Sequence, residues 1–85
     1  GAYLSLAELK NSHRVTGSKQ VRKAITQGLA RKVFIAGDAE PHIVEPIIEL
    51  CRQNDIDYQT VESMKALGEA CGIEVGSAAA ATLNE

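Results

Sequence analysis

Aromatic residues and cysteines are scarce in this chain of 85 residues, which has no tryptophan, two tyrosines, one phenylalanine and two cysteines. Readers of single-stranded RNA stack bases on exposed aromatic rings, and this chain has too few rings for that mode, since Phe34 and Tyr58 lie in strand-like runs and are expected in the core. Cys51 and Cys71 have no neighbouring Cys or His at zinc-finger spacing. We expect two free, buried thiols.

Long apolar runs are also absent. No stretch approaches the roughly 18 to 20 apolar residues of a membrane span, and no charged-then-apolar leader is visible. We therefore expect a cytoplasmic protein without a membrane partner. The length suits one hydrophobic core, so residues 1–85 are expected to form one domain. No apolar surface stripe requires a dimer, and we expect a monomer.

Charge of opposite sign is concentrated in the two parts of the chain, although the net charge is only −2. Residues 1–36 carry seven Lys and Arg against the single acid Glu8, a net of +6. Residues 37–85 carry two basic residues against ten acids, a net of −8. An anion responds to the charge within about 8 to 10 Å rather than to the total. The basic part is equally compatible with a binding face and with a solvated face.

Hydrophobic spacing indicates alternating helices and strands. Helices are expected over residues 3–13, over 19–29, after Pro41 and over 62–72, the last with Met64, Leu67 and Cys71 inward. Residues 32–38 and 56–61 read as strands. Pro46 predicts either a kink or a late start of the third helix.

The segment 73–83, IEVGSAAAATL, is ambiguous, because its alanines favour helix by propensity whereas its flanks fit a loop and a last buried strand. The alternation as a whole predicts an α/β protein, a three-layer α/β/α sandwich with a mixed four-stranded sheet.

Catalytic and cofactor motifs are not evident. His13 and His42 belong to no metal or nucleophile motif, and the acids are scattered over helix faces. The segment Gly17-Ser18-Lys19 is too short to be a triphosphate-binding loop. We expect no enzymatic activity, no metal site and no cofactor.

The start of the predicted second helix, Thr16 to Lys23, is the most informative segment. A helix start with free backbone N–H groups and basic side chains suits an anion, such as a small phosphate compound or a nucleic-acid backbone. Lys19 can donate to the O6 and N7 edge of a guanine, and Gln20 offers both a donor and an acceptor. Lys23 follows one turn later on the same face. This pattern favours recognition of a structured RNA.

Three stretches and the alanine-rich end together resemble the kink-turn RNA-binding ribosomal protein family. The stretches are GSKQVRKAITQG, VFIAGDAEP and IELCRQNDIDYQTVESMKALGEACGIEVG, and the resemblance spans roughly residues 14–83. Archaeal and eukaryotic members carry Asn-Glu at the positions of Lys19 and Gln20, whereas Lys-Gln resembles the short bacterial branch.

The resemblance implies an α/β/α fold, no catalysis and a partner RNA containing a kink-turn, a sharply bent duplex with tandem sheared G·A pairs. That RNA could be ribosomal or a riboswitch. The implied RNA contacts fall on a helix start, a later loop and one acid: Gly17, Ser18, Lys19, Gln20, Lys23, Ile73, Glu74, Val75 and Glu40.

Two other functions stay open at this stage. Related folds serve as protein-docking modules in the translation machinery, which protection of residues 37–85 by a protein would favour. Similar folds also serve as accessory substrate-binding domains of RNA-modifying enzymes, although these 85 residues leave no room for a catalytic domain.

Overall fold

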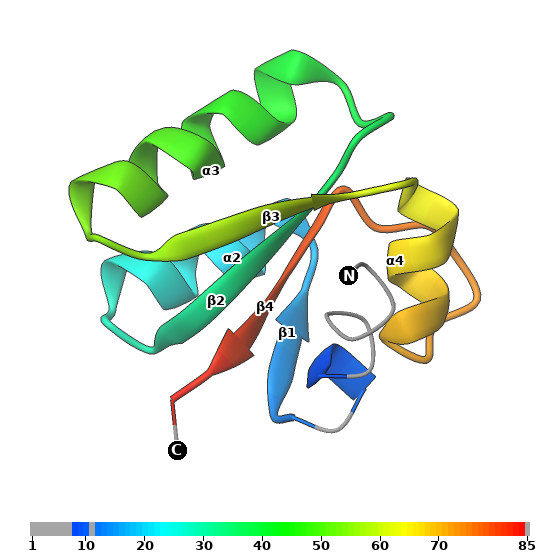
Figure 1. Cartoon of the computed structure of the whole chain (residues 1–85), viewed down its shortest axis with the longest axis horizontal. Helices are drawn as coiled ribbons and strands as arrows, with labels where there is room; N and C mark the ends of the chain where they lie inside the picture. The colour runs from blue at the N-terminus through cyan, green and yellow to red at the C-terminus, as the bar shows by residue number, and fades with distance from the viewer. Residues whose placement is uncertain (1–7, 11, 85) are drawn as a thin grey trace.

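The computed structural model describes residues 8–10 and 12–84 and forms one sheet with helices on both sides (Figure 1). The strands are β1 (Arg14–Thr16), β2 (Ala30–Ala36), β3 (Asp57–Val61) and β4 (Ala79–Leu83). The helices are α2 (Ser18–Thr26), α3 (Pro41–Gln53) and α4 (Met64–Ala70). Residues 8–10 are also helical, and the rest of the predicted first helix lies largely outside the described residues.

The sheet is mixed, with the strand order β1-β4-β2-β3. β4 runs antiparallel to β1 and β2, while β2 and β3 are parallel. Val15, Ala81 and Val33 pair across the sheet and share the face covered by α2 and α3. The other face carries Arg14, which reaches the end of α4. The predicted three-layer sandwich is therefore confirmed.

The core lies on both sides of the central strands. Phe34, Ile25, Ile47 and Leu67 are fully buried, and residues 33–36 of β2 are covered from both faces. The ambiguous alanine segment is a strand, because β4 is hydrogen-bonded between β1 and β2 and packs under both helical layers. Alanines 79–81 have no exposed surface. Small side chains there let α2 come close to the sheet.

Two sequence-based expectations about the core are wrong. Tyr58 was expected inside but is 37% exposed, because β3 is an outer strand whose pairing partner is β2 alone in the described part of the chain. Met64 was expected to point inward but is 36% exposed at the first turn of α4. Leu67 and Cys71 of the same helix are buried as expected.

The third helix begins at Pro41, with Glu40 at its N-cap, and continues through Pro46 without a late start. Pro41 is at the start of the helix, where the missing N–H costs nothing. Val44, Ile47 and Cys51 form its buried stripe.

Both cysteines are free and buried, as the sequence suggested. Burial raises the pKa of the Cys51 thiol to about 11. Burial also raises the pKa of Cys71, although the nearby Arg14 guanidinium partly opposes this.

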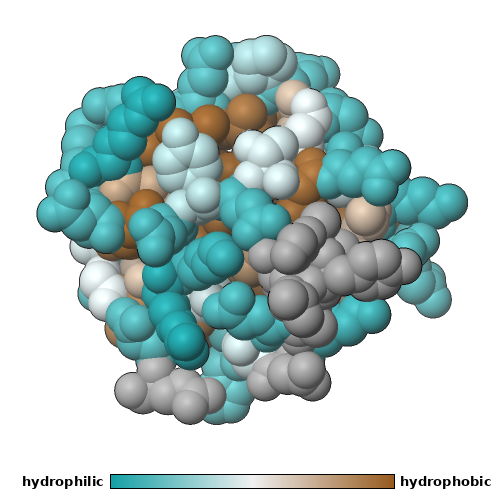
Figure 2. Space-filling model, in the orientation of Figure 1, coloured by the Kyte–Doolittle hydropathy of each residue, from teal (hydrophilic) through white to brown (hydrophobic). Residues whose placement is uncertain are grey.

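The surface is mainly polar on the side shown in Figure 2, with apolar atoms visible in its upper part, over α3 and β3. Among the helices in the described ranges, none is long and apolar enough to cross a membrane.

Candidate nucleic-acid interface

The turn between β1 and α2 places a glycine at a helix start. Gly17 is the N-cap of α2 and has a φ of 92°, in the region that glycine adopts most readily. Its carbonyl accepts the first helical hydrogen bond from the Val21 N–H at 3.0 Å. No side chain caps this end of the helix. The N–H groups of the first turn therefore face outward, as at anion-binding helix starts.

Basic and amide side chains surround that turn. Lys19, Gln20 and Lys23 are all exposed on α2, and the first turn contains no acid. A cation at a helix N-terminus is unfavourable by a few tenths of a kcal/mol, about 0.3 or more, because it opposes the helix dipole. A bound anion would remove that penalty. The residues predicted for the helix start thus lie together, with their side chains accessible.

The loop from Ile73 to Ser77 follows α4 and is irregular. Gly72, with a φ of 75°, ends the helical segment, and the Ile73 N–H then donates to the Gly68 carbonyl at 3.1 Å. Ile73 is half-buried against the core. Glu74 is exposed, and Val75 is 71% exposed. An apolar side chain so exposed contributes little to the core and is available for contact with a partner.

Gly68 explains how this loop can lie so close to α4. A Cβ atom at position 68 would overlap the backbone carbonyl of Val75. Gly76 approaches Met64 similarly, since a Cβ there would lie 3.1 Å from the Met64 Cβ. The path of the loop therefore depends on two positions without side chains.

The helix start and the loop meet at one backbone atom. The Gly17 N–H donates to the Ala79 carbonyl at 2.9 Å, and the Ser77 hydroxyl donates to the same oxygen at 2.7 Å. Ser77 is buried, and its N–H donates to the Met64 carbonyl at 3.0 Å. The two segments that the sequence predicted separately are thus held side by side at the end of the sheet where β4 begins.

Arg14 binds the end of α4, just before the loop begins. Its guanidinium donates to the Cys71 carbonyl at 2.9 Å, at the end of α4. It also donates to the carbonyls of Lys10 at 3.3 Å and Ser12 at 3.4 Å. One side chain therefore connects β1, the segment before it and the residue that precedes the turn into the loop.

Glu40, the remaining predicted site residue, lies between the Asp38 turn and α3. It is exposed at the N-cap of α3, and its Oε2 atom lies 3.1 Å from the Nδ1 atom of His42. The preceding turn is joined to α4, because the Met64 N–H donates to Asp38 Oδ1 at 2.7 Å. No contact described for Glu40 leads to the helix start or to the 73–77 loop.

The chemistry available in this interface is that of binding. Across the described residues, no group of three His, Cys, Asp or Glu side chains could hold a metal ion. What converges is a row of N–H groups, two lysines, one amide and an exposed valine.

Sequence reasoning missed the residues that position the interface: Gly68, Ser77 and Arg14. A glycine inside a helical pattern is a usable signal, because it costs helix stability and so indicates a close approach. Ser77 and Arg14 gave no local signal, since their bonding partners depend on the tertiary fold.

Comparisons with known proteins agree with the fold and with the character of the surface. Residues 3–85 match the model of the ribosomal protein L7Ae/L30e/S12e/Gadd45 family. An RNA-binding protein of Caldanaerobacter subterraneus is 43% identical over 76 residues, which cover 89% of this chain and 93% of the relative. An RNA-binding protein of a Geobacillus species is 39% identical, covering 88% and 92% of the two chains.

A solved structure, that of the Giardia lamblia 15.5kD RNA binding protein, superposes with a TM-score of 0.89. The match is 28% identical in sequence and covers 94% of this chain and 71% of the Giardia protein.

Proposed function

The chain belongs to the ribosomal protein L7Ae/L30e/S12e/Gadd45 family, and from this premise we propose that it binds structured RNA at a kink-turn and stabilises the bent form. Relatives from bacteria and the Giardia protein are named as RNA-binding proteins. These names agree with the expectation of a protein without catalysis. The cytoplasmic location and the monomeric state stay predictions.

The observation that carries the proposal is the shared acceptor at Ala79. It holds the start of α2 and the 73–77 loop together, through Gly17 and Ser77. A sharp bend in RNA presents two neighbouring features, the base pairs beside the bend and the bend itself. A protein surface with two fixed parts can contact both at once.

The proposed division of roles follows from chemistry. Lys19 and Gln20 contact the exposed guanine edges of sheared G·A pairs, with phosphates near Gly17, Ser18 and the Lys23 ammonium. The loop residues Ile73, Glu74 and Val75 cover the bend, with the exposed valine as its apolar contact. Glu40 is the least supported member of the set, because its described partner is His42.

The electrostatic arrangement supports the same orientation. The net charge of +6 lies in residues 1–36, which include the whole of α2, while the ten acids lie in residues 37–85. Within residues 1–36, α2 itself carries three basic side chains and no acid, so an approaching polyanion is attracted to it. Binding stabilises a bend that the RNA already samples, which is a shift of population.

A titration with two RNA hairpins tests the proposal. One hairpin contains a kink-turn with tandem G·A pairs, and the other has those pairs replaced by G·C and A·U. Tight binding to the first hairpin alone is the expected result. Equal, salt-sensitive binding to both would mean that the protein offers only a basic patch. Binding to neither would contradict the proposal and favour a protein partner.

A further inference from the structure

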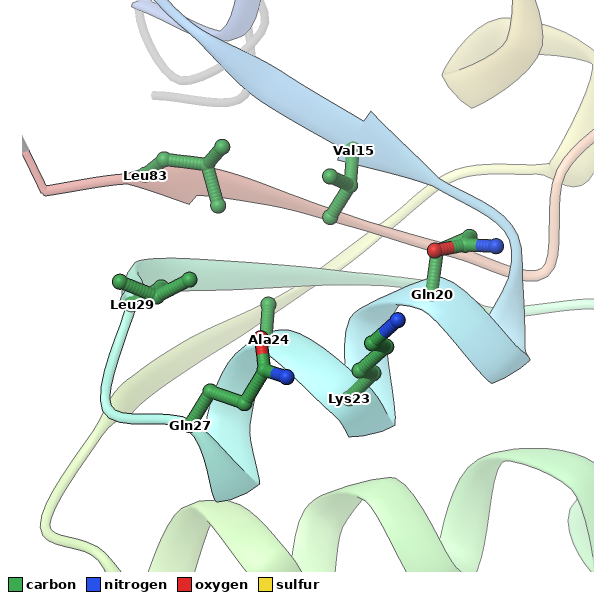
Figure 3. A pocket seen from close by; sticks show the side chains of 7 residues that line it. All are labelled: Val15, Gln20, Lys23, Ala24, Gln27, Leu29 and Leu83. Carbon is green, nitrogen blue, oxygen red and sulfur yellow. The ribbon is translucent and has the colours of Figure 1, made fainter.

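A groove of about 230 Å³ lies beside α2, on the face of the sheet that carries Val15 and Leu83 (Figure 3). Its polar side chains come from α2 and its C-cap, and apart from Ala24 of α2 its apolar side chains come from the strands and from the turn before β2. Gln20 and Lys23 belong to α2 and Gln27 is its C-cap residue, and the three are spaced as one stripe. The groove is therefore continuous with the proposed recognition segment but extends beyond it.

The apolar wall of the groove consists of Val15, Leu29 and Leu83. Leu29 is 48% exposed, and Val15 and Leu83 are only half-buried. These side chains lie where α2 leaves the β1 edge of the sheet incompletely covered. An apolar surface is therefore exposed beside the polar side chains of Gln20, Lys23 and Gln27.

The size and the charge of the groove limit its occupant. Sites for drug-sized ligands typically have volumes of about 300 to 1,000 Å³, so this groove suits a single ring system. Its rim carries the Lys23 ammonium and two amides, and the lining contains no acid. A flat group with an apolar face, a polar edge and an attached anion matches this arrangement.

We propose that the groove takes one unstacked nucleobase of the RNA strand that leaves the bend. The face of the base lies against Leu29, Val15 and Leu83. The amide of Gln27 or Gln20 bonds to its edge, since each amide offers a donor and an acceptor. The adjoining phosphate lies near Lys23. This inference rests on the proposed function, because the kink-turn brings the strand to α2.

The test compares a blunt kink-turn hairpin with two extended hairpins. One extended hairpin has a short run of unpaired nucleotides at its 5′ end, and the other has the same run at its 3′ end. Wild type is compared with Gln27→Ala and Leu29→Ser, both at exposed positions. Gln53→Ala is the matched control, because Gln53 is an exposed glutamine at the end of α3 and outside the groove. Thermal unfolding checks that each variant is folded.

The wild type is expected to bind one extended hairpin about tenfold tighter than the blunt one, the gain expected from burying one apolar contact pair. Gln27→Ala and Leu29→Ser should lose that gain and keep the affinity for the blunt hairpin, while Gln53→Ala behaves as wild type. Photocrosslinking with 4-thiouridine at the unpaired positions should label the groove.

Equal binding of all four proteins to blunt and extended hairpins would overturn the proposal. The proposal would also fail if Leu29→Ser binds the blunt and extended hairpins as wild type does but no longer binds a protein that wild type binds. The groove would then be a protein-binding site. The proposed function has its own readout, the preference of wild type for the blunt kink-turn over its G·C and A·U version. The two ideas can therefore fail separately.

Discussion

The two parts of the candidate interface are built in different ways. The start of α2 is a regular helix that shows its side chains and N–H groups to solvent, and its geometry follows from local hydrogen bonds after Gly17. The 73–77 loop has no regular structure and depends on Gly68, on the Ser77 hydroxyl and on Arg14, which come from three parts of the chain. The start of α2 presents the polar groups that can bind RNA. The shape of the 73–77 loop depends on residues elsewhere in the chain that hold it in place. Substitutions should therefore affect the two parts differently.

The largest expected effect is that of Gly68→Ala on the loop. Helix propensity alone would make this change stabilising by about 1 kcal/mol. The new methyl group would overlap the Val75 carbonyl, which is backbone and cannot rotate away. We expect a net loss of about 3 kcal/mol of unfolding free energy, at the upper end of overpacking costs. Urea denaturation measures it.

Glu69→Ala is the matched control, because it changes an exposed neighbour on the same helix and should stay within about 0.5 kcal/mol of wild type. A Gly68→Ala protein as stable as wild type would show that the loop can move away from α4 at little cost. The contrast between the two parts would then disappear.

Lys19→Ala tests the helix start. It should weaken binding of the kink-turn hairpin by about 2 kcal/mol, as expected for a lysine that reads a base edge. Stability should hardly change, because Lys19 is exposed. Arg52→Ala removes the same charge from the last turn of α3, outside the candidate interface, and should have little effect. Equal losses of RNA affinity in both variants would leave only a general contribution of charge.

Ser77→Ala breaks the connection between the parts from the side of the loop. Loss of one buried hydrogen bond to the Ala79 carbonyl should cost about 1 kcal/mol of stability, and RNA binding should also weaken. Ser63→Ala is the control, since it removes a capping bond to the Ala66 N–H of similar worth, about 1 kcal/mol. That variant should lose stability and keep its RNA affinity. Similar RNA affinities for both variants would mean that Ser77 does not position the loop.

Val75→Ala should have the smallest effect. It tests whether the loop makes an apolar contact with RNA, in contrast to the charged contacts of the helix start. Removing two exposed carbons should weaken RNA binding by about 0.5 to 1 kcal/mol. The slope of log Kd against log salt concentration should stay at the wild-type value, whereas Lys23→Ala, which removes the proposed phosphate contact, should flatten it by roughly one unit. Stability should be unchanged. A flattened slope for Val75→Ala would contradict an apolar role for the loop.

The sequence predicted the parts of the fold that depend on local pattern. The second helix, the buried strand after it and the proline at the start of α3 each carry their own signal, and the structure agrees. The helix-start residues were also visible locally, because Gly17 precedes an amphipathic run.

The rest depended on which elements lie next to each other. The alanines favour helix until the chain places three of them, residues 79–81, in the strand between β1 and β2. Tyr58 looked like a core residue because its strand alternates, and only the strand order shows that β3 is at the edge. The support of the loop by Ser77 and Arg14 involves bonds to distant backbone atoms, which no local pattern encodes.

The connection at Ala79 has a consequence for how this protein can diverge. Its acceptor is a main-chain carbonyl, which every amino acid at position 79 would supply. The Gly17 donor is likewise a main-chain N–H, which every residue except proline provides. Mutation can therefore change the side chains that meet the ligand while this bond between the two parts is inherited unchanged. Removing this bond takes a change to the backbone at position 17, such as a proline or an ester in place of the amide.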